Sequence, residues 1–194
     1  KAYTAGGVIT IDGLYVKPWN TENPKLYTCR VSLLKIGRVL DVQEQRIGFR
    51  TAEFRENAFY LNGEKVFLRG LNRHQCWPYM GYAAPESLQR EDARILKEEL
   101  GCVAVRTSHY PPAPVFLELC DELGFYVVDE ADLETHGFGK RLGGTGYDPD
   151  DIWPCRDPQW RDAFVDRAVR LLQRDKTHTC VIMWSLGNEA NYGI

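Results

Sequence analysis

The stretch "GCVAVRTSHYPPAPVFLELCDELGFYVVDE", residues 101–130, decides the fold because two apolar runs flank a helical pattern. The run "VAVRTS" (103–108) predicts one buried strand, and "FYVVDEA" (125–131) predicts another. Between them, apolar side chains recur at helical spacing in a stripe that Gly124 closes: Phe116, Leu119, Cys120 and Leu123. Strands that are buried on both faces and joined through a helix indicate parallel pairing.

The same alternation of strand and helix continues on both sides of this unit. Upstream, "VFLRG" (66–70) predicts a strand, and a helix follows over 85–100 with proline at its start and glycine just past its end. Downstream, Asp157 and Pro158 are typical of an N-cap and first helical position, and "VIMW" (181–184) predicts the fourth strand. Four such steps, without a G-x-G-x-x-G turn after the first strand, favour the first half of a (β/α)8 barrel over a dinucleotide-binding fold.

Residues 1–56 contain no convincing helical pattern. Alternating β-branched residues in 27–34 and 39–54, with turn signals at Asn23-Pro24 and Gly37, predict a few strands of a β-sandwich. A complete sandwich needs about 100 residues, so only part of one is expected. We therefore assign the chain to the α/β class, with part of a β-sandwich in residues 1–56 and the first half of the barrel in residues 57–194, where Asn62-Gly63 turns a hairpin.

Composition excludes several classes of partner. The formal net charge of −3 favours neither nucleic acid nor an anionic membrane surface, and no apolar run approaches the roughly 20 residues that span a bilayer. The six cysteines are scattered without a C-x-x-C pair, which favours reduced thiols and a cytoplasmic protein. The Gly-rich segment 137–151 is long enough for a loop beside a site, and a surface insertion fits it equally well.

Polar side chains follow each of the four predicted strands. They are Asn72, Arg73 and His74 after the first, Arg106, Ser108, His109 and Tyr110 after the second, Asp129, Glu130, Asp132, Glu134 and His136 after the third, and Asn188 and Glu189 after the fourth. Each alone has an ordinary structural explanation, such as a hydrogen-bonded histidine or an arginine that pairs with a carboxylate across strand ends. Together they mark the face on which barrel active sites are built. His178, which precedes the fourth strand, is expected to be structural.

At this point the motifs resemble a known family. The segments "LNGEKVFLRGLNRH" (61–74), "VRTSHYPP" (105–112) and "RDKTHTCVIMWSLGNEANYG" (174–193) are similar to glycoside hydrolase family 2. The pair "DEADLETHG" (129–137) and "SLGNEANYG" (185–193) resembles the β-galactosidases of that family. The resemblance covers nearly the whole chain, and it implies that residues 1–56 are the end of an immunoglobulin-like β-sandwich that precedes the barrel. In "NRHQCWPYMGY" (72–82) the family usually has further histidines, which affects the expected leaving-group site and not the class.

The resemblance implies a retaining mechanism with two carboxylates and a set of residue roles. Glu189 matches the acid/base, and Asn188 matches the neighbour that hydrogen-bonds the sugar 2-hydroxyl. His74 and His109 match residues that hold the galactose. Glu134, His136 and Glu189 match the ligands of a Mg²⁺ ion, and a monovalent cation would bind outside these residues. Asp132 and Arg106 are expected to support the strand ends.

The family pattern also implies that the chain is incomplete. Its nucleophile should come from a later strand, beyond Ile194, and Lys1 reads as an internal start. We therefore expect a fragment of a β-galactosidase that cleaves terminal non-reducing β-D-galactose from lactose-like substrates, with the isolated piece inactive and the full-length protein a homo-oligomer. Two alternatives remain: a β-glucuronidase of the same family, which needs a cationic pocket for the sugar carboxylate, and a non-catalytic carbohydrate-binding or complementation module.

Overall fold

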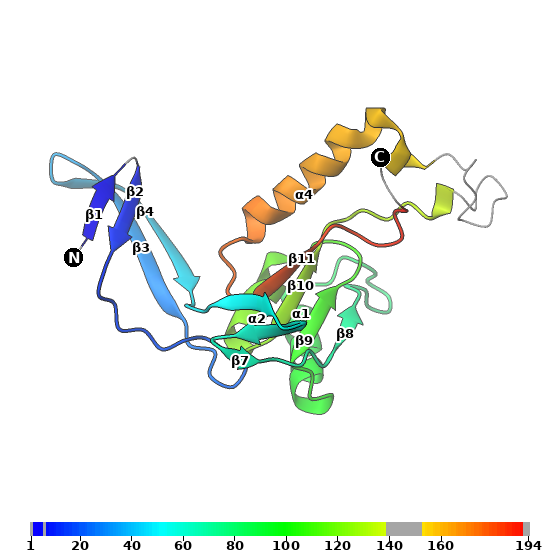
Figure 1. Cartoon of the computed structure of the whole chain (residues 1–194), viewed down its shortest axis with the longest axis horizontal. Helices are drawn as coiled ribbons and strands as arrows, with labels where there is room; N and C mark the ends of the chain where they lie inside the picture. Colours follow the sequence, from blue (N-terminus) through cyan, green and yellow to red (C-terminus); the bar gives the residue numbers. More distant parts are fainter. Residues whose placement is uncertain (1, 6, 139–152, 192–194) are drawn as a thin grey trace.

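The computed structural model describes residues 2–5, 7–138 and 153–191 of the chain (Figure 1). Most of the Gly-rich segment 137–151, with its two open interpretations, lies outside the described residues. Within the described ranges, no helix has both the length and the apolar composition that crossing a lipid bilayer requires.

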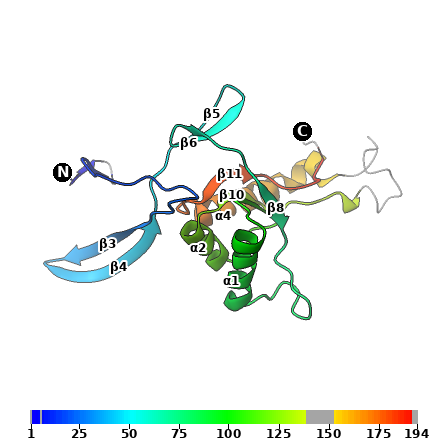
Figure 2. The ribbon, with the colours of Figure 1, turned by 90° about the horizontal axis from the view of Figure 1, so that it is seen from below.

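Four parallel strands form the central sheet, in the order β8, β9, β10, β11. Their bounds are β8 (Gly70–Arg73), β9 (Ala104–Thr107), β10 (Tyr126–Glu130) and β11 (Val181–Ser185). A helix links each strand to the next, and Figure 2 shows α1 and α2 side by side beneath the strands. The predicted first half of a (β/α)8 barrel is therefore confirmed.

The first strand differs from its prediction. The apolar run 66–70 was expected to be the strand, but pairing with β9 begins only at Gly70 and continues to Arg73. Gly70 starts the pairing because a Cβ at this position would overlap the carbonyl oxygen of Ala104. Asn72 and Arg73 consequently lie in β8 rather than beyond it, as Asp129 and Glu130 lie in β10.

The predicted helices form, and the first and third differ locally from the prediction. The first consists of α1 (Glu86–Arg94) and a π-helical turn η1 (Ile95–Glu99), and α2 (Pro114–Leu123) ends at Gly124, which has a φ of +74°. After the turn η2 (Pro154–Arg156), Asp157 accepts a hydrogen bond from Gln159 N as predicted for an N-cap. The turn that it caps is the 3₁₀ helix η3 (Pro158–Trp160), and α4 (Arg161–Asp175) follows.

The core lies between the sheet and these helices. Its buried members include Phe116, Leu117, Leu119 and Cys120 of α2, Val105 of β9, and Phe125 and Val127 at β10. Leu123 of the predicted stripe is 36% exposed, at the end of the helix. Cys102, Cys120 and Cys180 are buried among apolar side chains, where a thiol packs as a small hydrophobe.

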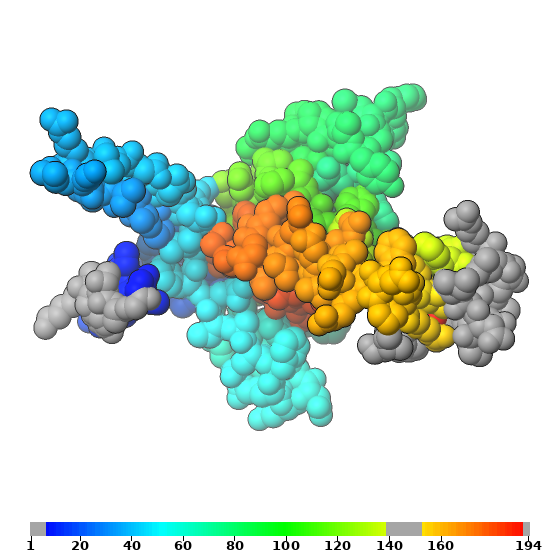
Figure 3. Space-filling view, turned by 90° about the horizontal axis from the view of Figure 1, so that it is seen from above, coloured from blue at the N-terminus to red at the C-terminus, as the bar shows by residue number. Residues whose placement is uncertain are grey.

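The N-terminal part contains antiparallel hairpins. β1 (Ala2–Ala5) pairs with β2 (Val8–Ile11), and β3 (Tyr27–Lys35) pairs with β4 (Arg38–Ile47) across the predicted turn at Gly37. A third sheet contains β5 (Ala52–Arg55), β6 (Ala58–Leu61) and β7 (Glu64–Lys65), and Asn62-Gly63 forms the predicted turn with both φ angles positive. Figure 3 shows the β3–β4 hairpin and the β5–β6 hairpin as separate lobes on the central body.

Two side chains, Trp19 and Arg50, connect this part to the amino-terminal end of the barrel strands. Trp19 is fully buried, and its Nε1 donates to the Asp121 carbonyl oxygen at 2.9 Å. The Arg50 guanidinium donates from Nε to the Thr179 carbonyl oxygen at 2.6 Å and from Nη2 to the Val181 carbonyl oxygen. Burial lowers the Arg50 pKa, and this effect outweighs the attraction of nearby negative charge.

Candidate active site

The carboxyl ends of the four parallel strands bring the predicted site residues to one face of the sheet. His74 follows β8, Arg106 lies in β9 with His109 just after it, Glu130 ends β10 with Glu134 and His136 in the next loop, and Asn188 and Glu189 follow β11. These side chains form two groups. One surrounds Glu130, the other contains Glu134, His136 and Glu189, and Asn188 contacts both groups.

Glu130 is at the centre of the first group. Its side chain is fully buried, and its Oε2 accepts hydrogen bonds from Arg106 Nε and Ser185 Oγ, each at 2.6 Å. Its Oε1 lies 2.7 Å from His109 Nδ1. Burial alone would raise the pKa of Glu130, but hydrogen bonds from Arg106, Ser185 and His109 outweigh it and lower the pKa. The carboxylate therefore stays ionised in the folded protein.

A row of rings extends outward from His109. The His74 and His109 rings meet edge to face with centroids 5.2 Å apart, and Tyr110 lies 6.3 Å from His74. Tyr82 packs edge to face on Tyr110 at 5.5 Å and is itself exposed. His74 is exposed as well, so the row presents polar ring edges and apolar faces to a ligand.

Asn188 is held by both its backbone and its side chain. Its N–H donates to the Leu133 carbonyl oxygen at 2.8 Å, next to Gly187, where a Cβ would overlap that same oxygen. The side-chain Oδ1 accepts from Arg106 Nη2 at 3.1 Å, and Nδ2 donates to Glu134 Oε1 at 3.3 Å. Because arginine can only donate, this contact fixes which end of the amide is oxygen.

The second group has the donor set of a divalent cation site. Potential ligand atoms of Glu134, His136 and Glu189 lie within 4.8 Å of one another. His136 Nδ1 is 2.8 Å from Glu189 Oε2 and 3.2 Å from Glu134 Oε1. These distances suit ion pairs, yet the angles do not satisfy a hydrogen bond, and this buried nitrogen has no hydrogen-bond partner among the described residues. A hard cation fits two carboxylates and an imidazole nitrogen arranged in this way.

Glu189 differs from its neighbours in exposure and in backbone conformation. Its side chain is 58% exposed, so a ligand could reach it. Its φ of +41° lies in the left-handed region, which residues other than glycine seldom adopt. The loop thus turns sharply at the carboxylate that the family pattern assigns to proton transfer.

Two of the other expectations have structural outcomes. His178 lies at the opposite end of the strands and pairs with Asp121 through Nδ1 at 2.7 Å, as expected for a structural histidine. Arg106 does support the strand ends, whereas Asp132 pairs instead with Arg167 of α4. Sequence reasoning gave Glu130 and Ser185 no role. The available signal for Glu130 was a carboxylate at the last position of a buried apolar strand, which marks its place but not its partners.

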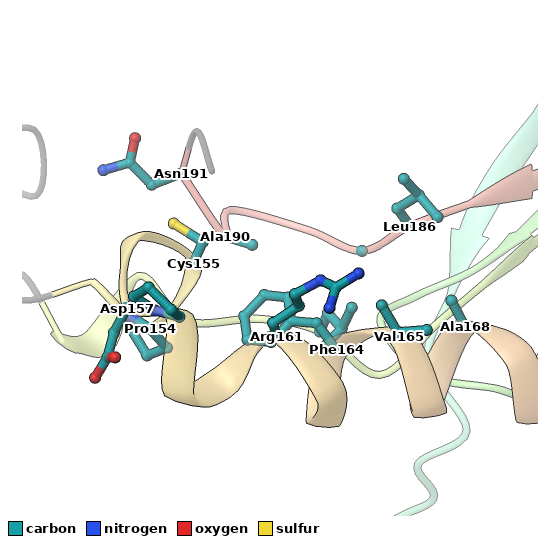
Figure 4. A pocket seen from close by; sticks show the side chains of 13 residues that line it. Pro154, Cys155, Asp157, Arg161, Phe164, Val165, Ala168, Leu186, Ala190 and Asn191 are labelled. Carbon is teal, nitrogen blue, oxygen red and sulfur yellow. The ribbon is translucent and has the colours of Figure 1, made fainter. Parts of the chain in front are cut away.

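An apolar cavity of about 710 Å³ lies behind the Asn188–Glu189 loop (Figure 4). Leu133, Phe164, Val165 and Leu186 contribute apolar walls, and Ala190 belongs to the same loop as Glu189. None of the predicted sugar or metal residues lines this cavity. The candidate site is therefore the strand-end face and not this apolar cavity.

Comparison with known proteins assigns both parts of the chain. The profile described as "Glycosyl hydrolases family 2, TIM barrel domain" matches residues 52–194, and "Glycosyl hydrolases family 2" matches residues 3–50. The β-galactosidase of Arthrobacter sp. (strain B7) is 45% identical over 187 residues, which are 95% of this chain and 17% of that protein. The β-galactosidase of Streptococcus thermophilus is 40% identical over 185 residues, covering 95% and 18%.

Solved structures agree on the fold. The structure of Bifidobacterium dentium β-glucuronidase complexed with coumarin-3-O-glucuronide matches with a TM-score of 0.77 and 28% identity, over 89% of this chain and 26% of that one. A β-glycosidase from Bacteroides vulgatus matches with a TM-score of 0.75 and 29% identity, over 92% and 22%. The chain spans about a sixth of the length of the β-galactosidases that it matches. It belongs to family 2 of the glycosyl hydrolases, and its residues 52–194 are part of the family's TIM barrel domain.

Proposed function

We propose that these residues form the first half of the catalytic barrel of a retaining β-galactosidase, which hydrolyses terminal non-reducing β-D-galactose residues of lactose-like substrates. The observation that carries the proposal is the convergence of Glu189, Asn188 and His109 at the strand ends, in a chain that is 40–45% identical to β-galactosidases. The substrate class rests on those relatives.

Each residue has a chemical task in this proposal. Glu189 is the acid/base: its carboxyl protonates the glycosidic oxygen as the bond breaks and later takes a proton from water. Asn188 Nδ2 faces the sugar 2-hydroxyl, where a hydrogen bond that strengthens in the transition state supports catalysis. His74 and His109 contact the remaining hydroxyls with their ring edges.

The second carboxylate of a retaining mechanism has no candidate among the described residues. Retaining enzymes hold their two carboxyl groups about 5–5.5 Å apart, with the nucleophile on the opposite side of the anomeric carbon. Glu130 is buried and hydrogen-bonded on both oxygens, so it cannot attack a sugar. Glu134 belongs to the candidate cation site, together with His136 and Glu189. We therefore propose that another part of a longer protein supplies the nucleophile and that the isolated 194-residue chain does not turn over substrate.

We propose that Glu134, His136 and Glu189 hold a Mg²⁺ ion. The partnerless His136 Nδ1 and the two facing carboxylates support this assignment. When bound, the ion supplies positive charge that offsets the repulsion between the carboxylates. Calorimetric titration of the protein with Mg²⁺ should show one site that Glu134→Gln weakens, whereas a control change at exposed Glu122 leaves it unaltered.

The two alternatives have less support. β-Glucuronidases are among the matched structures, but at 27–29% identity, well below the 40–45% of the β-galactosidases. A non-catalytic carbohydrate-binding or complementation module would bind galactose without turnover even in the complete protein. We also propose that the parent protein is a cytoplasmic homo-oligomer. The free thiols support the cytoplasmic location alone, since disulfides are rare in the cytoplasm.

The test is a comparison of substrates and leaving groups in the complete protein. The complete protein should cleave 4-nitrophenyl β-galactoside faster than 4-nitrophenyl β-glucuronide. Glu189→Gln should lower kcat/KM by about 10²–10⁴-fold for a sugar leaving group, because kcat/KM reports the bond-breaking step in which the proton donor acts. The loss should be smaller for nitrophenol, which leaves without protonation.

The control is Glu86→Gln, which changes an exposed glutamate that pairs with Arg90 on α1. It should leave both rates unchanged. A faster β-glucuronide, or equal losses for both leaving groups in Glu189→Gln, would contradict the proposal.

A further inference from the structure

Glu130 has no part in the chemistry proposed above, yet it contacts His109 directly and Asn188 through Arg106. It is the fully buried carboxylate at the end of β10, and three donors from β9, the following loop and β11 converge on it: Arg106, His109 and Ser185. Its own N–H donates to Thr107 Oγ1 at 2.9 Å, which anchors the end of β10 to β9. A charged group without water is normally costly, so such complete pairing points to a defined task.

The first consequence concerns the ring of His109. Glu130 Oε1 lies 2.7 Å from Nδ1, and an ionised carboxylate can only accept. Nδ1 therefore carries a proton, and Nε2 is the ring nitrogen left for a ligand. The longer contact of 3.4 Å between Arg106 Nη2 and the same Nδ1 is weaker and does not decide the tautomer.

The second consequence concerns Asn188. Glu130 holds Arg106 through Nε, and the other arm of the guanidinium, Nη2, donates to Asn188 Oδ1. The planar fork of arginine transmits the orientation rigidly from one end to the other. The amide Nδ2 is thereby turned away from Arg106, toward Glu134 and the open face.

We propose that Glu130 is the positioning residue of this site. It presents His109 Nε2 and Asn188 Nδ2 to the sugar in one fixed geometry, without touching the sugar itself. The inference rests on the proposed glycosidase function and adds to it a residue on which correct placement of both sugar contacts depends. A misplacement of about 1 Å can lower a rate about 10²-fold, so the effect should be large for a residue that lies behind the contact surface.

A double-mutant cycle in the complete enzyme separates this role from a general structural one. Glu130→Gln keeps the shape but removes the charge, and it should lower kcat/KM about 10²-fold, mostly through kcat. In a His109→Ala background the same change should cost at most about 10-fold, because one of its two recipients is already gone. Asp129→Asn, a neighbouring buried carboxyl on the opposite face of β10, is the control and should stay within about threefold.

Equal losses in both backgrounds would overturn the proposal, since a structural defect adds independently of His109. If Glu130→Gln does not fold, Glu130→Asp keeps the charge but shortens the side chain, and at least a 10-fold loss is expected; full activity in this variant would equally overturn it. In the unaltered protein, ¹⁵N shifts that place the His109 proton on Nε2 would do the same, whichever glycoside is cleaved. A preference for β-glucuronides would refute the proposed substrate but leave the cycle valid.

Discussion

The half barrel buries many of its apolar side chains, whereas the β3–β4 hairpin exposes its own. Leu117, Phe125 and Val127 in the barrel are completely buried. Leu33 and Leu34 in β3 are about 60% exposed, and the hairpin projects from the body (Figure 3). Both parts form their predicted strands, so the difference arises in packing and not in secondary structure.

The separation in sequence between packing partners explains the difference. In the barrel, each strand pairs with the next one along the chain, and the linking helix covers that pair, so consecutive units build a continuous core. In a sandwich, the inner face of a hairpin is covered only by a second sheet. Within the described residues, β3 and β4 pair only with each other. Half of a barrel can therefore hold a core, and a part of a sandwich cannot.

Trp19 should break this comparison with the largest effect. Trp19 belongs to the N-terminal part of the chain, yet it is fully buried. Its ring packs against the side chain of Tyr126 in the barrel. Trp19→Ala should lower the free energy of unfolding by about 3–5 kcal/mol, as expected for a buried aromatic. Tyr15→Ala, at a fully exposed ring four residues earlier, should change it by less than about 0.5 kcal/mol. Urea unfolding measures both, and similar values would show that the anchor is not formed.

A matched pair of leucines should sharpen the comparison. Leu117→Ala creates a cavity in the barrel core and should cost about 2–5 kcal/mol. Leu33→Ala, on the exposed face of β3, should cost about 0.5 kcal/mol or less. Both are measured by urea unfolding of the same protein. A large loss at Leu33 would mean that another surface covers β3 in solution.

A further prediction concerns the dependence of the free energy of unfolding on pH. Burial, together with the nearby carboxyl of Asp175, raises the pKa of Asp129 from 3.8 to about 7. Between these values the folded protein keeps a proton that the unfolded chain has lost, so stability should fall as pH rises from 4 to 7, by at most about 1.4 kcal/mol per pH unit.

Asp129→Asn should flatten this slope in unfolding curves at several pH values. Asp166→Asn, on the exposed face of α4, should not. An unchanged slope in Asp129→Asn would show that Asp129 is ionised across this range.

Sequence reasoning located the strand ends because buried parallel strands leave long apolar runs. It placed the first strand too early, since apolar residues 66–68 lead through Arg69 directly into Gly70 and no local pattern marks where pairing starts. It also brought His109, Asn188 and Glu189 to one face correctly. The role of Glu130 could not be predicted, because its three partners come from positions 106, 109 and 185, and only the folded sheet shows that they meet.

At Glu189 the left-handed backbone conformation favours glycine for stability, whereas the proposed chemistry requires a carboxylate. A residue with a Cβ in this region costs on the order of 1–3 kcal/mol relative to an unstrained conformation, a cost that glycine would largely avoid. Substitution toward glycine here would stabilise the loop while removing the carboxylate. In a lineage that is no longer selected for activity, stability alone would therefore favour glycine at position 189. That substitution would remove the carboxylate and with it the activity.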